Sequence, residues 1–286
     1  MNVVRTIDEL RALLKGYRAS QKSIGLVPTM GFLHEGHASL IRHSKSQNEV
    51  TVVTLFVNPL QFNNLEDLDK YPRSEAADLK LLDHLKVEVV FIPNTKEIYP
   101  SPVQLSLKMG SLDQNLEGAF RPGHFSGVAV VVAKFFNIVM PDRAYFGLKD
   151  LQQFMVINQL VKDLSFPIEI VGVPIVRSES GLALSSRNAR LSQEGIKTAE
   201  NIHKGLMIAK SMLTESNALY PVKKAISEHF NHLSDLRVEY ISIINPETFE
   251  EIETFSPSQS VAICVAAYVE GIRLIDNLYL RPDSQA

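Results

Sequence analysis

The chain has 286 residues, which is long enough for two ordinary domains with separate cores. Apolar residues make up 45% and charged residues 21%, which is typical of a globular protein and excludes a largely disordered one. The net charge of −3 gives no general attraction to nucleic acid or to acidic membrane surfaces, so we expect neither as a partner. Any phosphate-binding site must therefore be built locally, from a few basic side chains and backbone N–H groups.

The first part of the chain alternates strand-like and helical patterns. Strands are predicted at residues 24–28, 51–57, 87–92, 143–146 and 168–176. Helices are predicted at 36–47, from an N-cap at Ser74 to Leu85, at 125–139 and at 150–164. This alternation predicts an α/β, Rossmann-like domain with a doubly wound parallel sheet, whose ligands bind at the carboxyl ends of the strands.

The character of the sequence changes after a polar, serine-rich stretch at residues 177–190. Helices are then predicted at 192–214 and 220–233, and strands at 237–244, 260–269 and 272–280. This order predicts a smaller α+β domain with an antiparallel sheet. We place the domains at 1–175 and 176–286.

Nothing in the sequence predicts export or membrane insertion. The amino-terminal segment from Met1 to Leu14 lacks the apolar stretch of a signal peptide, and no segment is apolar for long enough to span a bilayer. The single cysteine, Cys264, cannot form an internal disulfide, and its apolar neighbours indicate a buried core residue. We therefore expect a cytoplasmic protein.

The strongest functional feature is the segment 28–37, PTMGFLHEGH, which runs from the first predicted strand into its helix. Such a junction can present unpaired backbone N–H groups and the positive end of a helix dipole to a phosphate. His34 and His37 are three residues apart, so they share a face of the first helical turn. Two imidazoles there can donate hydrogen bonds to phosphate oxygens, so we predict an ATP site that transfers an adenylyl group.

Two other interpretations of the histidine pair stay open. The pair could hold a metal ion, although the sequence places no third ligand and the spacing differs from His-Glu-x-x-His. Both residues could also be ordinary surface or capping residues. The sequence has no P-loop and no Gly-x-Gly-x-x-Gly motif, which makes those two nucleotide-binding classes poor candidates.

Further polar residues follow other predicted elements. Asn58 and Gln61 come directly after the second strand, where an α/β sheet places its ligands, although Asn-Pro is also a common turn opening. Asp78 could meet a magnesium ion, but a solvated helix face is the interpretation that we prefer. Arg121 lies in a glycine-bearing turn, where it could pair with a carboxylate or phosphate or remain an ordinary surface residue.

Two later segments also favour anion binding. Lys149 lies at a helix amino end, where a cation opposes the helix dipole, and this cost indicates an anion nearby. Gln152 and Gln153 follow it, and one of them could face the ligand. The segment 184–188, Leu-Ser-Ser-Arg-Asn, combines two hydroxyls with a guanidinium and could clamp a phosphate, whereas a polar interdomain linker is the alternative.

The ordered motifs PTMGFLHEGH, FVNPLQF, YPR, EGAFRPGHFSGV, FGLKDLQQF and LALSSRN resemble the pantothenate synthetase (pantoate–β-alanine ligase) family. This family is part of the HxGH nucleotidylyltransferase superfamily, and the resemblance runs through essentially the whole chain. It implies condensation of (R)-pantoate with β-alanine, with ATP and Mg²⁺ as cofactors, through a pantoyl-adenylate, and release of AMP and pyrophosphate. It also implies a homodimer.

The same resemblance assigns site residues. The catalytic residues would be His34, His37 (the proton donor), Lys149, Ser185 and Arg187. The ATP contacts would be Met30, Gly31, Phe32, Leu33, His34, Glu35, Gly36, His37, Gly147, Leu148, Lys149, Asp150, Val176, Leu184, Ser185, Ser186 and Arg187. The pantoate contacts would be Asn58, Gln61, Arg121 and Gln153, with Gln61 also near β-alanine. The magnesium ligands stay unassigned.

The residues alone leave three other functions open. These are a nucleotidylyltransferase that stops at a phosphate or nucleotide acceptor, a class I aminoacyl-tRNA synthetase, and a non-enzymatic ATP sensor or scaffold. Gln61 and Gln153 suit a neutral-hydroxyl carboxylic acid, and the short, slightly acidic chain argues against tRNA binding. We further expect residues 177–188 to close over the active site as a lid that shields the adenylate from water.

Overall fold

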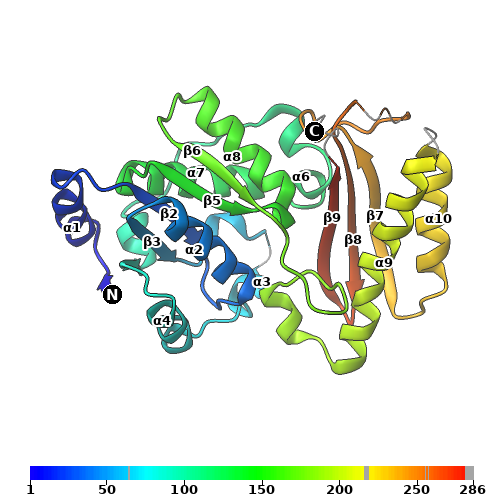
Figure 1. Cartoon of the computed structure of the whole chain (residues 1–286), viewed down its shortest axis with the longest axis horizontal. Helices are drawn as coiled ribbons and strands as arrows, with labels where there is room; N and C mark the ends of the chain where they lie inside the picture. Colours follow the sequence, from blue (N-terminus) through cyan, green and yellow to red (C-terminus); the bar gives the residue numbers. More distant parts are fainter. Residues whose placement is uncertain (64, 216–218, 255, 257, 281–286) are drawn as a thin grey trace. The chain divides into compact units, whose positions relative to one another are not determined.

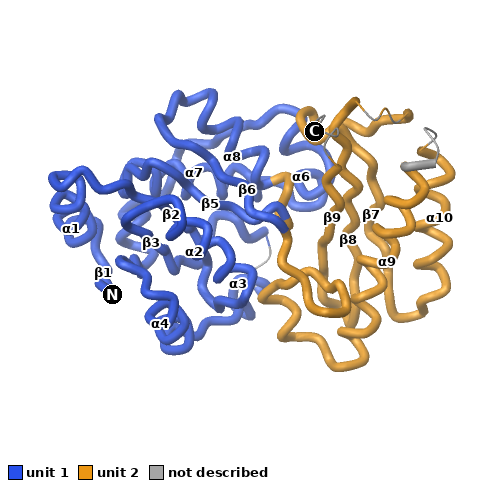
Figure 2. Tube along the Cα trace, viewed as in Figure 1, with its two compact units in different colours: residues 1–148, 153–174 blue, residues 149–152, 175–286 orange. Residues whose placement is uncertain are grey.

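The computed structural model of the chain describes residues 1–63, 65–215, 219–254, 256 and 258–280. The chain forms two compact units, shown in Figure 2: unit 1 comprises Met1–Leu148 and Gln153–Pro174, and unit 2 comprises Lys149–Gln152 and Ile175–Ala286. Across the described ranges, we find no helix with both the length and the apolar character needed to cross a membrane.

Unit 1 is built on a six-stranded parallel sheet with the strand order β1-β4-β3-β2-β5-β6. Figure 1 labels the strands β2, β3, β5 and β6 of this sheet. The strands are β1 (Asn2–Val4), β2 (Ile24–Thr29), β3 (Val50–Leu55), β4 (Val89–Phe91), β5 (Arg143–Gly147) and β6 (Glu169–Val173). The strand order reverses between β2 and β5, because β3 and β4 follow on one side of β2 while β5 and β6 lie on the other. Doubly wound sheets bind ligands at such a switch point. The predicted α/β fold with a doubly wound parallel sheet is confirmed.

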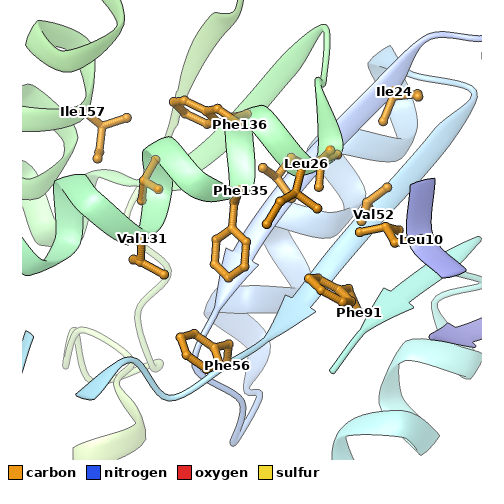
Figure 3. Close-up of a cluster of buried hydrophobic side chains, with 14 of the residues drawn as sticks. Leu10, Ile24, Leu26, Val52, Phe56, Phe91, Val131, Phe135, Phe136 and Ile157 are labelled. Carbon is orange, nitrogen blue, oxygen red and sulfur yellow. The ribbon is translucent and has the colours of Figure 1, made fainter. Parts of the chain in front are cut away.

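Helices cover both faces of this sheet. One face packs against α1 (Ile7–Ala19), α7 (His124–Val139) and α8 (Leu151–Asp163), and the other against α2 (Glu35–Gln47) and α4 (Glu75–His84). Figure 3 shows the first of these cores, in which the Phe135 ring lies edge-on to both Phe56 and Phe91. The helix predicted at 125–139 is buried on nearly every side, as its apolar sequence indicated.

Two elements at the amino terminus, β1 and α1, were missed in the sequence. The three residues of β1 take strand geometry by pairing in parallel with β4, a partner far along the chain. For α1 the sequence did hold a signal, because Thr6 and Glu9 form a capping box. Leu10 and Leu14 follow at helical spacing, and both are fully buried.

Several boundaries differ from the prediction for local reasons. The strand predicted at 168–176 ends at Val173, because Pro174 has no N–H to continue the ladder. Ser74 occupies the N-cap position of α4, but its side chain makes no capping hydrogen bond. The irregular stretch after β4 holds only short turns of helix: α5 (Thr95–Ile98), η2 (Gly110–Asp113) and α6 (Glu117–Phe120). Short helical turns also follow β3, at η1 (Pro59–Gln61) and α3 (Leu65–Asp69).

A buried polar cluster fixes α2, the helix that carries the two histidines, to the sheet. Asn48 Nδ2, just beyond α2, donates to the Tyr145 hydroxyl on β5 over 2.7 Å. The hydroxyls of Ser44 and Thr51 join α2 to β3 over 2.8 Å. A Cβ at Gly25 would lie 2.3 Å from Ser44 Oγ, so a side chain there would push α2 away from β2. The carboxyl-terminal end of α2 is therefore fixed to β3 and β5.

Unit 2 contains a three-stranded antiparallel sheet in the order β7-β8-β9. Its elements are α9 (Gln193–Glu215), α10 (Leu219–Asn231), β7 (Leu236–Ile244), β8 (Val261–Val269) and β9 (Ile272–Leu280). The apolar faces of both helices pack on the sheet to form its core. The predicted antiparallel α+β architecture is confirmed, and Cys264 is buried in β8 as predicted.

Candidate functional site

The histidine pair opens α2 with a reciprocal capping arrangement. His34 is the N-cap, and its Nδ1 accepts a hydrogen bond from the Gly36 N–H over 3.1 Å. His37 Nδ1 accepts in turn from the His34 N–H over 3.3 Å. The two ring centroids lie 4.1 Å apart with their planes inclined at 43°. The predicted shared face is therefore confirmed, and the capping interpretation is compatible with a functional one.

These hydrogen bonds set the tautomer of both rings. A ring nitrogen that accepts an N–H carries no proton, so each neutral imidazole carries its proton on Nε2. The Nε2–H groups of His34 and His37 are therefore donors, and both rings are only partly buried. Gly36 permits this arrangement, because a Cβ there would lie 2.8 Å from Cε1 of the His34 ring. The pair can thus donate two hydrogen bonds to anionic oxygens.

The loop before α2 differs from the prediction, because its backbone N–H groups already have acceptors inside the protein. The Gly31 N–H donates to Thr29 Oγ1 over 3.2 Å. The N–H groups of Phe32 and Leu33 donate to the two carboxylate oxygens of Asp78, over 2.8 and 2.7 Å. Together with the two hydrogen bonds to His34 and His37, these contacts give every backbone N–H of residues 31–34 and 36 an acceptor. The expectation of unpaired amides at these positions is wrong. Thr29, His34 and His37 supply three of the acceptors from within the segment, and Asp78 supplies the other two from α4, which no local pattern connects to the loop.

Asp78 is also not the solvated helix-face residue that we preferred from the sequence. Asp78 is only 4% exposed, and its carboxylate faces the loop rather than water. Burial raises the pKa of Asp78, and the hydrogen bonds from the Leu33 and Phe32 amides partly oppose this shift. The sequence did contain a signal that Asp78 is buried. Asp78 stands four residues before the buried Leu82 and so shares its face of α4.

Asn58 and Gln61 belong to one hydrogen-bonded group in unit 1. Asn58 is 1% exposed; its Oδ1 accepts from the Tyr99 hydroxyl over 2.8 Å, and its Nδ2 donates to the Gly127 carbonyl over 3.0 Å. The same Nδ2 lies 3.2 Å from Gln61 Oε1, and Gln61 Nε2 lies 3.0 Å from the sulfur of Met30. Asn58 therefore orients Gln61, and Gln61 contacts the loop that leads to the histidines.

Tyr99 and His124 complete this group, and sequence reasoning missed both. Burial raises the pKa of Tyr99, so its hydroxyl remains a neutral donor. His124 Nδ1 donates to the Gln61 carbonyl over 2.8 Å, and Arg121 Nη1 lies 3.2 Å from His124 Nε2. Arg121 is thus a half-buried residue tied to Gln61 rather than an ordinary surface arginine. Among the described residues, no hydrogen bond joins Gln153 on α8 to these side chains.

The remaining predicted ATP contacts lie in residues 147–150 and 176–187. Gly147 and Leu148 end β5 and begin η3 (Leu148–Asp150) in unit 1, whereas Lys149 and Asp150 group with unit 2. Lys149 Nζ lies 3.7 Å from Asp150 Oδ1, which supplies a carboxylate close to this cation. The Lys149 carbonyl accepts from Asn277 Nδ2 on β9 over 2.8 Å. The backbone of Lys149 is therefore held by the sheet of unit 2.

The segment 176–188 is anchored within unit 2. The Leu184 N–H donates to the Val176 carbonyl over 3.0 Å, which closes a hairpin-like turn. Arg177 forms a two-pronged ion pair with Asp276 on β9, over 2.6 and 2.9 Å, and the Asp276 side chain is 4% exposed. Ser185 Oγ accepts from the Arg187 N–H over 3.2 Å and so caps η4 (Ser186–Arg190). The lid motion stays a prediction; the anchoring shows that the segment is part of the fold of unit 2.

The described part of the chain contains no group of three or more His, Cys, Asp or Glu side chains that could hold a metal ion.

The fold defines the chain as a doubly wound α/β protein with an added antiparallel α+β unit. The sequence model of the family described as pantoate-beta-alanine ligase matches residues 2–279. The pantothenate synthetases of Cytophaga hutchinsonii and Bacteroides thetaiotaomicron are 48% and 45% identical to it, each over 97% of this chain and 98% of the relative. The chain belongs to the pantoate–β-alanine ligase family, and the predicted membership of this enzyme family is confirmed.

Solved structures agree with this assignment. Pantothenate synthetase from Thermus thermophilus superimposes with a TM-score of 0.92 at 41% identity, covering 99% of this chain and 100% of that one. Pantoate-beta-alanine ligase from Francisella tularensis, complexed with beta-gamma ATP and beta-alanine, has a TM-score of 0.79 at 35% identity and covers 97% of each chain.

Proposed function

We propose that this enzyme condenses (R)-pantoate with β-alanine to form pantothenate, through an enzyme-bound pantoyl-adenylate. The carboxylate of pantoate attacks the α-phosphorus of ATP, the bond to the β-phosphate oxygen breaks, and pyrophosphate leaves. The amine of β-alanine then attacks the acyl carbon, AMP leaves, and the amine nitrogen loses a proton. Family membership supports the overall reaction, and the relative solved with beta-gamma ATP and beta-alanine supports two of its substrates.

The observation that carries the proposal is the pair of Nε2–H donors on α2. Negative charge develops on the departing pyrophosphate, and donors held in place stabilise it without reorganisation. His34 and His37 present such donors, because their Nδ1 atoms are already engaged with the backbone. We assign His37 as the proton donor. We also propose that the loop 30–37 binds ATP.

The hydrogen-bonded group around Gln61 suits pantoate. Pantoate has hydroxyl groups and a carboxylate, and a neutral amide can both donate to and accept from such groups. Asn58, which accepts a hydrogen bond from Tyr99, orients Gln61, while Arg121 supplies a cation that can pair with a carboxylate. Gln153 is assigned to pantoate by the resemblance alone. Because Asn58 is fully enclosed and its amide is bound by the fold, we assign it to positioning Gln61.

The proposal assigns further ATP contacts to residues 147–150 and 176–187. Lys149 and Arg187 supply cations for the phosphates, and Ser185 and Ser186 supply hydroxyls; Gly147, Leu148, Asp150, Val176 and Leu184 would contact the nucleotide. Magnesium would arrive on ATP, because Mg²⁺ is usually bound by substrate phosphates with one or two carboxylates. When bound, it neutralises phosphate charge. A cytoplasmic homodimer and closure of residues 177–188 also belong to the proposal.

Exchange of pyrophosphate into ATP tests the first half-reaction, because it needs ATP, Mg²⁺ and pantoate but no β-alanine. We expect pantoate-dependent exchange, and exchange that requires a phosphate-bearing acceptor instead would refute the ligase. His37→Ala should lower the exchange rate about 100- to 1,000-fold. The lost capping acceptor costs only about 1 kcal/mol of stability, so the variant should still fold.

His43→Ala is the matched control, because His43 is an exposed histidine on the same helix. It should retain the wild-type exchange rate. Near-normal exchange by His37→Ala, with folding confirmed by circular dichroism, would reject the role assigned to His37. Tight ATP binding by the wild type without any AMP formed from pantoate and β-alanine would favour an ATP sensor.

A further inference from the structure

Asp78 reaches from α4 into the loop between β2 and α2, and its environment is unusual for a carboxylate. It is 4% exposed, and its two oxygens accept the N–H groups of Phe32 and Leu33 over 2.8 and 2.7 Å. We call this pair of contacts the Asp78 latch. The latch joins α4 to the loop that precedes the histidine pair.

The loop takes a backbone conformation that needs such support. Gly31 has φ of +80° and Phe32 has φ of +50°, so two successive residues lie in the left-handed region. Glycine adopts this region readily, whereas an aromatic residue is strained there and persists only where surrounding contacts hold it. The Asp78 carboxylate holds the N–H of Phe32 itself and that of the next residue. A Cβ at position 31 would lie 3.1 Å from Asp78 Oδ2, so the latch also fits closely around Gly31.

Successive backbone N–H groups in a turn form a concave site for an anion. Here the protein's own carboxylate fills that site, so the amides of Phe32 and Leu33 already have an acceptor. An incoming phosphate at this end of β2 must then use other donors. The Nε2–H groups of His34 and His37 follow directly along the chain.

We propose that Asp78 is a positioning residue for ATP: the latch holds the loop 30–33 so that the imidazoles of His34 and His37, rather than the loop amides, receive the triphosphate. The inference rests on the proposed adenylation of pantoate. Asp78 acts through the loop and touches no reacting atom. It differs from a magnesium ligand, which would act on the metal, and from a bare negative charge, which would weaken ATP binding by repulsion.

The three roles give different kinetics in the pyrophosphate exchange assay. Asp78→Ala removes both acceptors, and we expect the KM for ATP to rise about 10- to 100-fold, since hydrogen bonds to a charged group are the stronger ones. The KM for pantoate should change little. Asp78→Asn keeps the shape and one acceptor, so its effect should be smaller. Asp83→Ala is the matched control, because Asp83 is exposed on the same helix.

Amide hydrogen exchange supplies a readout that does not depend on activity. Peptides that cover residues 30–37 should exchange faster in Asp78→Ala than in the wild type or in Asp83→Ala, without ATP present. If Asp78→Ala does not fold, Asp78→Asn serves both measurements.

Each remaining outcome overturns the latch. An unchanged KM for ATP in a folded Asp78 variant would show that ATP binding does not depend on the hydrogen bonds between Asp78 and the loop. A defect that disappears as Mg²⁺ is raised would make Asp78 a metal ligand, and a lower KM for ATP would make it a repulsive charge. If the wild type shows no pantoate-dependent exchange, the proposed function fails, and unchanged amide exchange in the variant would then refute the latch independently.

Discussion

Gly127 is the fourth residue of α7, where this helix passes over the η1 turn. A Cβ at this position would lie 2.3 Å from the Leu60 carbonyl oxygen, 2.5 Å from the Leu60 carbonyl carbon and 2.9 Å from the Gln61 nitrogen. All three are backbone atoms, which no rotamer change can move aside. Gly127→Ala must therefore push α7 and η1 apart.

The size of the effect follows from these distances. Non-bonded atoms meet comfortably at about 3.5 Å, so the two elements must separate by roughly 1 Å. Overpacking of this kind costs about 1–3 kcal/mol, and a clash with fixed backbone belongs at the upper end. The better helix propensity of alanine stabilises the folded state by about 1 kcal/mol and partly offsets this loss. We expect a net loss of about 2 kcal/mol.

Gly16→Ala is the matched control. Gly16 is exposed on α1, and a Cβ there would meet nothing within 4 Å, so only the gain in helix propensity remains. Differential scanning calorimetry should show Gly127→Ala melting about 4–8 °C lower than the wild type and Gly16→Ala about 2–4 °C higher.

The same substitution should affect substrate binding. The Gly127 carbonyl accepts from Asn58 Nδ2, which also contacts Gln61, so separation of α7 from η1 disturbs the residues proposed to bind pantoate. We expect the KM for pantoate in the exchange assay to rise about 10-fold, the equivalent of one hydrogen bond. If Gly127→Ala raised the melting temperature as Gly16→Ala does, the close approach of α7 to η1 would be refuted.

Two further predictions concern unit 2. Asp276→Ala leaves the guanidinium of Arg177 without its carboxylate, and the free energy of unfolding should fall by about 3 kcal/mol in urea titrations; a loss below about 1 kcal/mol would contradict the anchoring of residues 176–188. His203 has its pKa lowered by burial and by Arg177, against the opposing effect of Asp276. The folded state therefore favours neutral His203, so its contribution to stability is fully present above about pH 6.5 and is lost as the pH falls through the lowered pKa. His203→Gln should flatten the dependence of stability on pH in that range, and an unchanged profile would show that another group causes it.

Local patterns predicted much of unit 1. Apolar runs of five to seven residues, rich in β-branched side chains, indicated central strands such as β3, and helical spacing put His34 and His37 on one face of α2. These features depend on residues that are neighbours along the chain, so the sequence shows them directly. The motif resemblance, which spans the chain, predicted the family that the comparisons confirm.

The contacts that shape the site escaped prediction. Asp78 and Phe32 are far apart in the sequence, as are Tyr99 and Asn58, and Arg177 and Asp276. A hydrogen bond between such residues exists only after the elements that carry them have packed, and nothing local marks its two ends. The sequence by itself therefore determined the order of the main elements from β2 onward, the parallel and antiparallel sheets and the histidine pair. Only the tertiary structure decided that a carboxylate from α4 occupies the amides of the loop, because packing alone brings α4 to the carboxyl end of β2.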